Sequence, residues 1–345
     1  MKAVFAIPGD MHRKTGGFIY EAELWAALNR IGCETAHLEL PDSFPVPTPQ
    51  DMATTLAALG VVPAGVPIIL DGFVSGTIDP RGLSQLAAPV IAITHHPLGH
   101  ETGLAPDRAA MLVAKERAAL AKVAHVVVPS PHTAATLQSH FGVERRRISV
   151  APPGFVKPRG FHPVPETPPL VLSVGLLAPR KGHDVLLAAL AAVDDLPWRA
   201  EIIGRQHDAA TARALHAQCA ALSLGARVAF LGEVEDAVLE ARLAAASIFA
   251  LATHYEGYGM VFGEAMLRGL PIVSCAAGAV PDTVGGAGIL VPPGNAAAFG
   301  VALRRMLAEP ETRAAYARTS ARQGADLPTW DDTARIVAGV IGALT

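Results

Sequence analysis

The sequence predicts an α/β protein built of two doubly wound, Rossmann-like domains that face a central cleft. Three observations predict this architecture. Short apolar runs alternate with alanine-rich helical stretches along the 345 residues, the alternation stops in a proline-rich stretch at 153–169, and it then starts again. Such alternation is typical of parallel sheets covered by helices on both faces. A chain of this length is long enough to fold as two domains of ordinary size.

Before the proline-rich stretch, strands are expected where apolar residues run without interruption, because a parallel strand is buried on both faces. The helices between them carry the chain back through right-handed crossovers. The expected strands cover residues 3–7, 35–40, 67–70, 89–94, 126–128 and 148–151, and the expected helices include 17–31, 107–122 and 131–141.

Six prolines within residues 153–169 disfavour both helix and sheet, so this segment is interpreted as a linker between domains at 1–152 and 170–328. Ligands of doubly wound sheets bind beyond the carboxyl ends of the strands, so the site is expected in the cleft between the domains. After the linker, the expected strands cover residues 170–175, 200–203, 227–231, 248–252 and 272–274, with helices at 183–193, 209–222 and 237–246.

Composition and charge exclude several classes of protein. The net charge of −3 gives no electrostatic basis for binding nucleic acid. Although 51% of the residues are hydrophobic, no apolar run approaches the roughly 20 residues of a membrane span. The first residues are expected to form a buried strand rather than a secretory signal, which predicts a cytoplasmic protein. Three widely spaced cysteines, Cys33, Cys219 and Cys275, indicate neither a disulfide framework nor a metal site.

The stretch from Glu256 to Glu264 carries the clearest chemical signal and reads Glu-Gly-Tyr-Gly-Met-Val-Phe-Gly-Glu. Glu256 stands in a loop with Gly257, Tyr258 and Gly259, and Glu264 is expected at the start of an apolar helix. A helix N-terminus has unpaired N–H groups and a partial positive charge, so it favours phosphate-bearing ligands. Two carboxylates beside it can accept hydrogen bonds from a ribose and from a sugar. The stretch therefore predicts a site for a nucleotide sugar.

A basic loop follows the first strand of the second domain and directly precedes a helix. It runs from Gly175 to Gly182 and contains Arg180 and Lys181. The two cations can neutralise a diphosphate, and Gly182 allows a backbone to approach closely. A basic pair of this kind can equally belong to a solvated loop. Its position between strand and helix, together with the motif at 256–264, favours diphosphate binding.

Gly16 and Gly17 follow the first strand and open a helix, but they lack the GxGxxG pattern of a dinucleotide site. Two interpretations stay open for the pair. The glycines either form a tight turn or provide a flexible lip whose backbone N–H groups contact a phosphate or a sugar.

Histidines follow another expected strand of the first domain. Thr94 ends the strand and is followed by His95 and His96, with His100 and Glu101 close behind. Neither an HExxH motif nor a cysteine pair accompanies them, so no metal site is predicted. A histidine at the carboxyl end of a strand is expected to hydrogen-bond a sugar or an acceptor hydroxyl. His95 is preferred because it comes first, and a buried structural role stays open for either one.

Taken in order, these motifs resemble the retaining glycosyltransferases of family 4 (glycosyl transferases group 1), which have the GT-B fold. The resemblance covers nearly the whole chain, and the ordered series is far more specific than any single motif. Its elements are the Glu-x7-Glu motif with Glu-Ala-Met-x-x-Gly-x-Pro at 264–271, Val174-Gly175 with Lys181-Gly182, Ile203-Gly204, Gly278 with Val280-Pro281, and Gly288-Ile-Leu-Val-Pro-Pro-Gly294.

The resemblance implies a role for each motif of the second domain. Glu264 would hold the ribose hydroxyls of the donor, and Glu256 would face the transferred sugar. The loop at 257–259 would lie against the sugar and phosphate. Lys181 would pair with the diphosphate, and Arg180 would assist it.

The same resemblance implies roles for the first domain. Gly16 and Gly17 would cap the diphosphate, and His95 stands at the place of a histidine that family members use near the sugar and the acceptor. The final helix, which begins near Trp330 and covers residues 329–345, would return to the first domain.

Three positions depart from the family pattern. Leu176 stands where family members usually have arginine, which removes one expected contact with the diphosphate, and Arg180 is the candidate substitute. Asp282 stands where glutamate is commoner, and Asn295 replaces a usual aspartate.

The expected activity is transfer of a hexose from a nucleoside-diphosphate sugar, with UDP-hexose as the default donor and GDP-hexose as the second choice. No Asp-x-Asp motif is present, so fixed cations are expected to stabilise the leaving diphosphate without an essential metal, and no tightly bound cofactor is expected. Retention by same-face attack within one ion pair is favoured over Glu256 acting as a covalent nucleophile.

The acceptor is expected to carry a hydroxyl and to be a lipid or a cell-surface polysaccharide precursor. Basic residues of the first domain suggest peripheral docking on the inner face of the cytoplasmic membrane, although a solvated surface explains them equally well. No oligomeric state is predicted. The basic residues in question are Lys115, Arg117, Lys122 and the run Arg145-Arg146-Arg147.

Three other functions remain to be distinguished. A nucleotide-sugar epimerase of the same fold would form product without an acceptor. A non-catalytic protein, which Leu176 would suit, would bind a nucleotide sugar without releasing nucleoside diphosphate. An NAD-dependent oxidoreductase would require the GxGxxG pattern that the sequence lacks.

Overall fold

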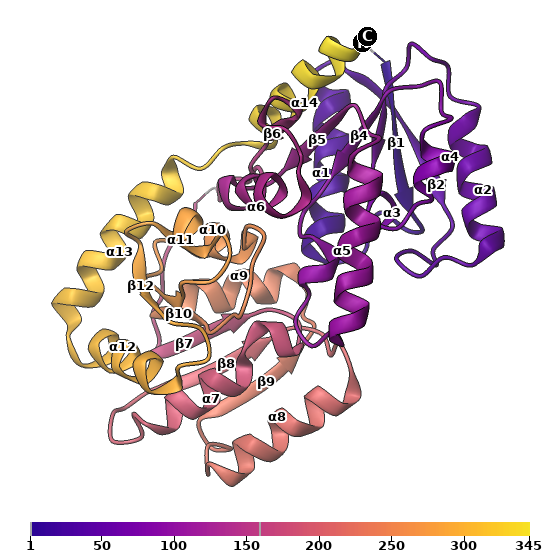
Figure 1. Ribbon diagram of the computed structural model, residues 1–345. Helices are drawn as coiled ribbons and strands as arrows, with labels where there is room; N and C mark the ends of the chain where they lie inside the picture. The colour runs from indigo at the N-terminus through magenta and orange to yellow at the C-terminus, as the bar shows by residue number, and fades with distance from the viewer. Residues whose placement is uncertain (1, 159) are drawn as a thin grey trace. The chain divides into compact units, whose positions relative to one another are not determined.

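The protein is described by a computed structural model that covers residues 2–158 and 160–345. The chain divides into two compact units: unit 1 comprises residues 1–156 and 328–345, and unit 2 comprises residues 157–327. Each unit is an α/β domain around one six-stranded sheet, and the strand pairings of the described residues are all parallel (Figure 1). The predicted class, two doubly wound α/β domains, is therefore confirmed.

The sheet of unit 1 has the strand order β2-β1-β3-β4-β5-β6. The order reverses between β1 and β3, which makes the carboxyl ends of these two strands the topological switch point of the unit. Its strands are β1 (Lys2–Pro8), β2 (Glu34–Leu40), β3 (Ile68–Leu70), β4 (Val90–Ile93), β5 (His125–Val128) and β6 (Ile148–Val150). Its helices are α1 (Gly16–Arg30), α2 (Pro49–Gly60), α3 (Gly72–Ser75), α4 (Pro80–Leu83), α5 (Pro106–Leu120), α6 (Pro131–Phe141) and α14 (Trp330–Leu344), with short 3₁₀ turns η1 (Leu98–His100) and η2 (Arg145–Arg147).

The sheet of unit 2 has the order β12-β11-β10-β7-β8-β9, so its switch point lies between β7 and β10. Its strands are β7 (Leu170–Val174), β8 (Arg199–Ile203), β9 (Val228–Gly232), β10 (Ile248–Leu251), β11 (Ile272–Cys275) and β12 (Gly288–Val291). Its helices are α7 (His183–Ala191), α8 (Ala209–Ala221), α9 (Asp236–Ala245), α10 (Met260–Leu267), α11 (Val280–Val284), α12 (Ala296–Ala308) and α13 (Pro310–Ala325), with the 3₁₀ turn η3 (Pro179–Lys181).

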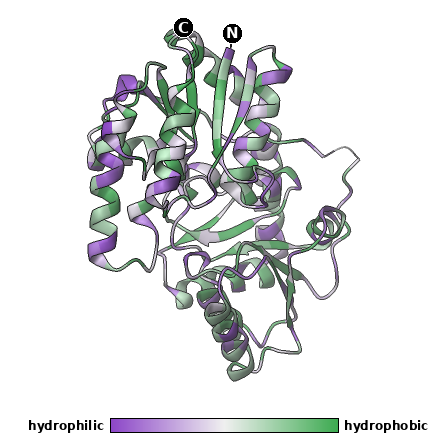
Figure 2. Ribbon diagram, turned by 90° about the vertical axis from the view of Figure 1, so that its right-hand side faces the viewer, coloured by the Kyte–Doolittle hydropathy of each residue, from purple (hydrophilic) through white to green (hydrophobic). Residues whose placement is uncertain are grey.

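The central strands form the cores because their side chains are apolar on both faces. Phe5 of β1, Ile69 of β3 and Phe249 of β10 are fully buried. Figure 2 shows the strands of both sheets largely in the green of hydrophobic residues, while purple is concentrated on helices and loops. This arrangement buries apolar surface on both sides of each sheet, as the uninterrupted apolar runs of the sequence predict.

Local signals fix the ends of the helices. The hydroxyl of Thr48 accepts a hydrogen bond from Asp51 N at 3.1 Å, and the Asp51 carboxylate accepts one from Thr48 N, which forms a capping box at the start of α2. Ser130 caps α6 through Thr133 N, and Gly142 ends that helix with a φ of 71°.

The expected strands and helices are present with ends shifted by a few residues at most, but α2, the short helices α3, α4 and α11, and β12 were not anticipated. The first half of α2 is rich in polar residues and follows a proline-rich stretch, so its apolar periodicity is weak. The four residues of β12 begin with Gly288 and are followed directly by Pro292, so the segment resembles a turn in the sequence. None of the described helices combines the length and the hydrophobicity that a membrane-spanning segment requires.

The proline-rich segment at 153–169 forms no helix or strand in its described part. Its second half is nevertheless fixed against unit 2. Val164 N and Glu166 N donate to the carbonyls of Ala244 and Ala245, and the Glu166 carboxylate pairs with Arg242 at 2.8 Å. The extended backbone that proline imposes is therefore held by the helix that it passes.

The C-terminal helix α14 packs in unit 1 beside α1 (Figure 1). The Trp330 ring meets the Tyr20 ring edge-on at 5.5 Å, and the hydroxyl of Thr333 donates to Pro152 O at 2.7 Å. The chain approaches α14 so closely at Gly154 that a Cβ there would lie 2.1 Å from Trp330 N. Only glycine fits at this point of contact.

We expect Gly154→Ala to destabilise unit 1 by about 1–3 kcal/mol, because the added methyl group meets backbone atoms that cannot move aside. Gly339→Ala is the matched control on α14, since its Cβ would meet nothing within 4 Å. A helix-interior alanine there should stabilise by roughly 0.5–1 kcal/mol. Urea unfolding and amide hydrogen exchange within α14 measure both effects. Equal stability of the two variants would contradict the close contact.

Candidate functional site

Two of the predicted residues meet at the switch point of unit 2. Lys181 lies in the loop that follows β7, and Glu256 lies in the loop that follows β10. These strands are neighbours in the sheet although 75 residues separate the two side chains along the chain. The carboxyl ends of neighbouring parallel strands meet at one edge, which brings the basic loop to the acidic one.

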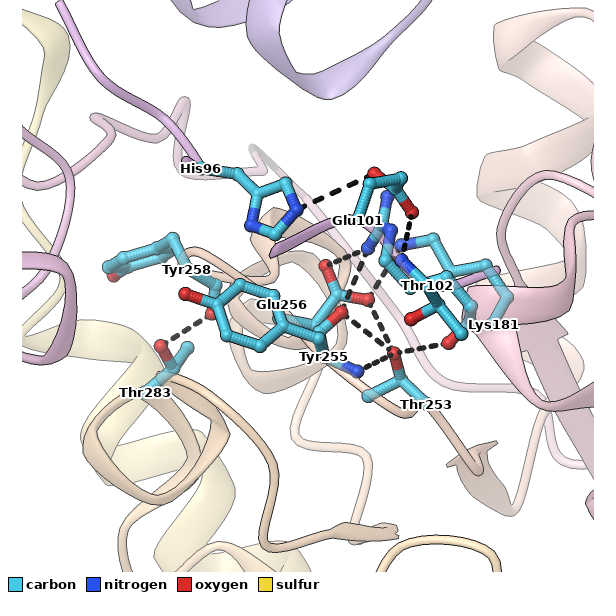
Figure 3. Close-up of polar contacts among 10 residues, drawn as sticks. His96, Glu101, Thr102, Lys181, Thr253, Tyr255, Glu256, Tyr258 and Thr283 are labelled. Atoms are coloured by element: carbon cyan, nitrogen blue, oxygen red, sulfur yellow. Dashed lines mark hydrogen bonds and ion pairs between the residues drawn. The ribbon is translucent and has the colours of Figure 1, made fainter. Parts of the chain in front are cut away.

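The Glu256 carboxylate is buried and has a partner at each oxygen (Figure 3). Lys181 Nζ donates to Oε1 at 2.7 Å, and Arg180 Nη1 lies 3.4 Å from Oε2. The Lys181 side chain is itself 11% exposed. The pair is therefore a desolvated ion pair, in which losing either partner would leave an uncompensated charge.

Thr253, at the carboxyl end of β10, completes the cluster. Its hydroxyl lies 3.0 Å from Glu256 Oε1 and 3.0 Å from the carbonyl oxygen of Arg180. Thr253 is fully buried, so this hydroxyl has no access to water and bonds within the cluster. It ties the loop after β7 to the loop after β10 (Figure 3).

The surroundings of Glu256 keep its side chain ionised. Burial by itself would raise the pKa of this carboxyl, but the charges of Lys181 and Arg180 and the hydrogen bonds from Lys181 and Thr253 outweigh burial and lower the pKa. At neutral pH the side chain is a carboxylate. It can orient cations and stabilise positive charge, and it cannot act as a proton donor.

Glycines shape the loop from Gly175 to Gly182 so that Lys181 can reach Glu256. The lysine side chain passes over Gly175, where a Cβ would lie 3.3 Å from Lys181 Cδ. Gly182 has a φ of 63°, and a Cβ there would lie 2.0 Å from the carbonyl oxygen of Ala252. The predicted close backbone approach at Gly182 is thus the packing of this loop on the end of β10.

His183 begins α7 and bonds to the loop between Gly175 and Gly182. Its Nε2 donates to the carbonyl oxygen of Leu176 at 3.1 Å, and the side chain is buried. Burial lowers the pKa of His183 to about 4, so the ring is neutral at physiological pH. This hydrogen bond holds the carbonyl group of Leu176 in place. The leucine side chain itself carries no charge, so it cannot supply the cation that the resemblance leads us to expect at this position.

Arg180 is directed at the loop after β10. Its Nη1 donates to the carbonyl oxygen of Tyr255 at 2.8 Å and approaches Glu256. The side chain thus adds positive charge to the cluster that contains Lys181. This placement keeps Arg180 in the candidate site, as the loop motif predicts.

Glu264 lies in the second turn of α10 and not at the start of the helix, because α10 begins at Met260. Gly259 precedes α10 with a φ of 88°. Because glycine has no side chain to cap the helix, the first N–H groups of α10 receive no side-chain acceptor from Gly259. Burial raises the pKa of Glu264, and Arg268 opposes the rise. Its carboxyl makes no hydrogen bond to any part of the chain that the structure describes, so it can receive hydroxyl donors.

The remaining motifs of unit 2 contact the loop that carries Glu256 and Tyr258. A Cβ at Gly278 would lie 2.3 Å from the carbonyl oxygen of Glu256, and the same oxygen accepts a hydrogen bond from Ala279 N at 2.8 Å. The hydroxyl of Thr283 donates to the carbonyl oxygen of Tyr258 at 2.7 Å (Figure 3). Asn295 caps α12 through Ala298 N, which is the task that aspartate would perform there.

A second group of predicted residues lies together in unit 1. His95 follows β4, and Gly17 lies at the start of α1 with its backbone against the His95 ring, where a Cβ would lie 3.3 Å from Cδ2. Gly16 has open space around it. Burial lowers the pKa of His95 to about 4, while Asp71 opposes the fall, so the imidazole is neutral at pH 7. That this group and the cluster of unit 2 bind one ligand stays a prediction.

His96 and Glu101 lie 3.5 Å apart in the same unit. Residues 2–158 and 160–345 contain no group of three or more histidine, cysteine, aspartate or glutamate side chains suited to a metal ion.

Several residues that build these clusters were not anticipated. Thr253 and His183 are single polar residues next to strand and loop motifs, and only their burial reveals their roles. Glu21 and Asp71 lie beside His95, but they come from distant segments of the sequence. The signal that could have identified Asp71 is its position directly after a strand.

Most of the basic residues considered for membrane docking bond to the protein itself. Arg117 donates to His140 O, Arg145 donates to Ile148 O, and Arg147 donates to the carbonyls at the end of α5 and beyond. Arg146 pairs with Glu144 at the surface. These arginines stabilise the connections between α5, α6 and β6.

Comparison with known proteins decides the family. The family model of glycosyl transferases group 1 matches residues 157–323, and that of Glycosyltransferase Family 4 matches residues 73–156. The GDP-mannose-dependent monoacylated alpha-(1-6)-phosphatidylinositol monomannoside mannosyltransferase of Corynebacterium glutamicum is 30% identical over 281 residues, which are 73% of this chain and 68% of that protein. This chain belongs to glycosyltransferase family 4.

Other relatives agree with this assignment. The D-inositol 3-phosphate glycosyltransferase of Geodermatophilus obscurus is 30% identical over 63% of this chain and 52% of its own length. The matches to the first curated relatives span about half the length of those proteins.

Solved structures establish the fold of this family member. The sucrose-phosphate synthase of Thermosynechococcus elongatus superposes with a TM-score of 0.85 over 99% of this chain and 98% of its own, at 23% identity. Anabaena HepE in complex with UDP and glucose gives 0.76 over 99% and 100%, at 17% identity. At these identities the likeness shows the fold alone, and the predicted GT-B fold is confirmed.

We expect Glu256→Gln to lower the free energy of unfolding by about 3 kcal/mol at pH 7, because the partly buried Lys181 and Arg180 lose their buried anion. The pKa of Glu256 is lowered in the folded state, so its pairing stabilises the fold above the ordinary value of 4.5 and is lost as pH falls through the folded value. The difference between wild type and variant should therefore shrink below pH 4.5. Urea unfolding at several pH values measures it.

The control is Asp195→Asn, which removes the surface pair with Arg304. Both members of that pair are about half exposed, so the loss should be small at every pH. A Glu256→Gln variant as stable as this control would contradict a buried ionised carboxylate.

Proposed function

We propose that this family 4 member is a retaining glycosyltransferase that moves a hexose from a nucleoside-diphosphate sugar to a hydroxyl acceptor. The observation that carries the proposal is the buried ionised Glu256, which holds Lys181 and Arg180 at the switch point of unit 2. Ligands of doubly wound sheets bind at this point. Two cations there suit a diphosphate, and a carboxylate beside them suits the sugar that it carries.

The two cations stabilise the leaving group. Cleavage of the anomeric C–O bond puts negative charge on the departing diphosphate and positive charge on the sugar. Lys181 and Arg180 are already oriented by Glu256 and Tyr255 O, so little reorganisation is needed when charge develops. Fixed cations of this kind can replace the divalent ion that an Asp-x-Asp motif would bind.

Glu256 acts in this proposal as an anion and not as a nucleophile. Lys181 and Thr253 bond to Oε1, and Arg180 approaches Oε2, so both oxygens are engaged. A carboxylate stabilised in this way is a weak nucleophile, which supports same-face attack within an ion pair. Its negative charge next to the sugar stabilises the oxocarbenium character of the transition state.

Glu264 receives the ribose of the donor. Its carboxyl is partly buried and makes no hydrogen bond to the described chain, so it can accept hydrogen bonds from two ribose hydroxyls. The adjacent start of α10 supplies backbone N–H groups beside the same ligand.

Names of relatives guide the choice of donor and acceptor to be tested. A corynebacterial relative is named as GDP-mannose-dependent and as acting on a phosphatidylinositol mannoside, and another relative is named for inositol 3-phosphate. Anabaena HepE, a structural neighbour, was solved with UDP and with UDP-glucose. We propose a UDP- or GDP-hexose donor and a phosphorylated polyol, glycolipid or polysaccharide precursor as acceptor.

Lys181→Ala should reduce transfer by roughly 10²–10³-fold, because it removes one preorganised donor to the leaving diphosphate. Glu264→Gln should chiefly weaken nucleotide binding. Release of nucleoside diphosphate from a panel of UDP- and GDP-hexoses, with inositol phosphate or lipid extract as acceptor, measures the first effect. Calorimetry with UDP and GDP measures the second. Arg304→Ala, at the surface of unit 2, is the control and should match wild type.

The same assays separate the alternatives. Conversion of the nucleotide sugar without an acceptor would indicate an epimerase, and nucleotide binding without release would indicate a non-catalytic protein. Transfer at wild-type rates in both Lys181→Ala and Glu256→Gln would overturn the proposed mechanism.

A further inference from the structure

A groove of about 490 Å³ lies at the surface of unit 1. Its walls come from three connections that follow strands of the sheet: residues 45–47 after β2, Thr77 after β3, and the first turns of α5 after β4. Each connection leaves a strand at its carboxyl end, which is the edge where doubly wound sheets bind ligands. The volume falls within the range of about 300–1,000 Å³ that is usual for small-molecule sites. The residues of the candidate site described above do not line this groove.

Apolar side chains form most of the lining. Val46 is 65% exposed and Met111 is 56% exposed, although both side chains are large and hydrophobic. Covering such side chains with another apolar group is favourable, because it removes their surface from water. The groove therefore suits a hydrocarbon. The other apolar members of the lining are Pro45, Pro47 and Leu112.

The groove is preformed, because the loop that carries Val46 is held in place. Phe44, two residues earlier, is buried in the core of unit 1. Val46 N donates to Ser43 O at 2.8 Å, and the Ser43 hydroxyl donates to Asp51 at 2.8 Å, at the capped start of α2. The opposite wall is the regular helix α5. An occupant would find both walls in position, which lowers the entropic cost of binding.

Two cations flank the apolar part of α5. Arg108, Met111, Leu112 and Lys115 share one face of the helix, since residues three, four and seven positions apart align. The cations stand about 10 Å apart along the helix axis. No described residue forms an ion pair or a side-chain hydrogen bond with either of them. Asp107 is the acid among the lining residues, and it lies in the first turn of α5, where the helix dipole favours a carboxylate. The lining is therefore apolar with a net positive charge.

Apolar walls between two cations suit a ligand that combines a hydrocarbon chain with an anion. Arg108 can bind a phosphate through two parallel N–H groups, and the aliphatic stem of Lys115 can cover a chain while its ammonium reaches the head group. We propose that the groove binds an amphiphile that carries a phosphate head group and an aliphatic chain. In the proposed glycosyl transfer this amphiphile is the acceptor. That role rests on the proposed function, whereas binding of the amphiphile does not.

Binding is tested with dodecyl phosphate below its critical micelle concentration, by methyl NMR of the methionine-labelled full-length protein. The Met111 signal is assigned by its loss in Met111→Leu, and dodecyl phosphate should shift it until the groove is saturated. Dodecyltrimethylammonium has the same chain with the opposite charge, and inorganic phosphate has no chain, so each should bind about tenfold more weakly or worse. Equal affinity for either of these probes would refute the proposal.

Charge reversal is the decisive change. The double variant Arg108→Glu/Lys115→Glu should bind dodecyl phosphate at least about tenfold more weakly and dodecyltrimethylammonium more tightly than wild type, because anions now face the head group. Arg81→Glu/Lys122→Glu is the matched control: it reverses one arginine and one lysine of unit 1 that do not line the groove. The control should keep wild-type affinities. The same affinities in both double variants would contradict the proposal.

The apolar wall is tested by Met111→Gln, which keeps the length of the side chain and makes it polar. Calorimetry should show an affinity for dodecyl phosphate about fivefold lower, because contact with the chain is lost. Val61→Thr is the control, since Val61 is 82% exposed in unit 1 and does not line the groove. Melting curves verify that each variant folds. An unchanged affinity in Met111→Gln would exclude a hydrocarbon from the groove.

Two other occupants would give different results. A second copy of the chain in the groove would make wild type a dimer in sedimentation equilibrium and Met111→Gln a monomer. A bilayer surface would make the protein sediment with phosphatidylglycerol vesicles, while monomeric dodecyl phosphate leaves the Met111 signal unchanged. Either result would overturn the proposal.

The transfer assay tests the acceptor role separately. Inositol phosphate and its dodecyl ester offer the same head group without and with a chain. The wild-type KM should be about tenfold lower for the dodecyl ester, and the Arg108→Glu/Lys115→Glu variant should lose this difference while its KM for the donor stays within about twofold. Equal KM values for the two acceptors in wild type would refute the acceptor role. If wild type transfers to no acceptor at all, the proposed function fails, while the binding measurements still decide the occupant of the groove.

Discussion

The candidate site depends on one desolvated ion pair, in which Glu256 is kept ionised by Lys181 and Arg180. Burial alone would make this carboxyl neutral, so its charge exists only because the two cations reach it. Those cations in turn are held close together, against their mutual repulsion, by the anion between them. Thr253 and the backbone glycines at 175, 182 and 278 allow the approach. The fold thus holds two positive charges side by side at the switch point of unit 2.

Both clusters of candidate site residues follow from strand order. In each sheet there are two neighbouring strands whose following connections run to opposite sides of the sheet. No crossover covers the space between the loops at their carboxyl ends, so side chains occupy that space. In unit 2 these strands are β7 and β10, and the loops after them supply Lys181 and Glu256. In unit 1 they are β1 and β3, and the residues after them include Gly17 and Asp71, while His95 comes from the end of the next strand, β4. The same topological feature therefore accounts for both positions.

The sequence predicted the architecture well because buried parallel strands are uninterrupted apolar runs, and that pattern is local. It also predicted Lys181, Glu256 and Glu264 as candidate residues, since glycine-rich motifs next to strands are local as well. It missed Thr253 and the Glu21–Asp71 pair, whose importance comes from burial and from partners in other loops, as far as 74 positions away for Glu21 and His95. It misplaced the start of α10, because a left-handed glycine at 259 begins that helix well before Glu264. Long-range burial of polar groups is the information that a single sequence lacks.

The two units place their buried acids in opposite electrostatic surroundings. Cations surround Glu256, so its pKa is lowered and it serves as a permanent charge for stabilising other charges. Glu21 is fully buried and has no cation within its described hydrogen-bonding partners, so burial raises its pKa to about 8, and burial likewise raises the pKa of Asp71 well above its ordinary value. Unit 2 therefore holds a buried acid that its neighbouring cations keep charged, and unit 1 holds buried acids whose surroundings favour the protonated form.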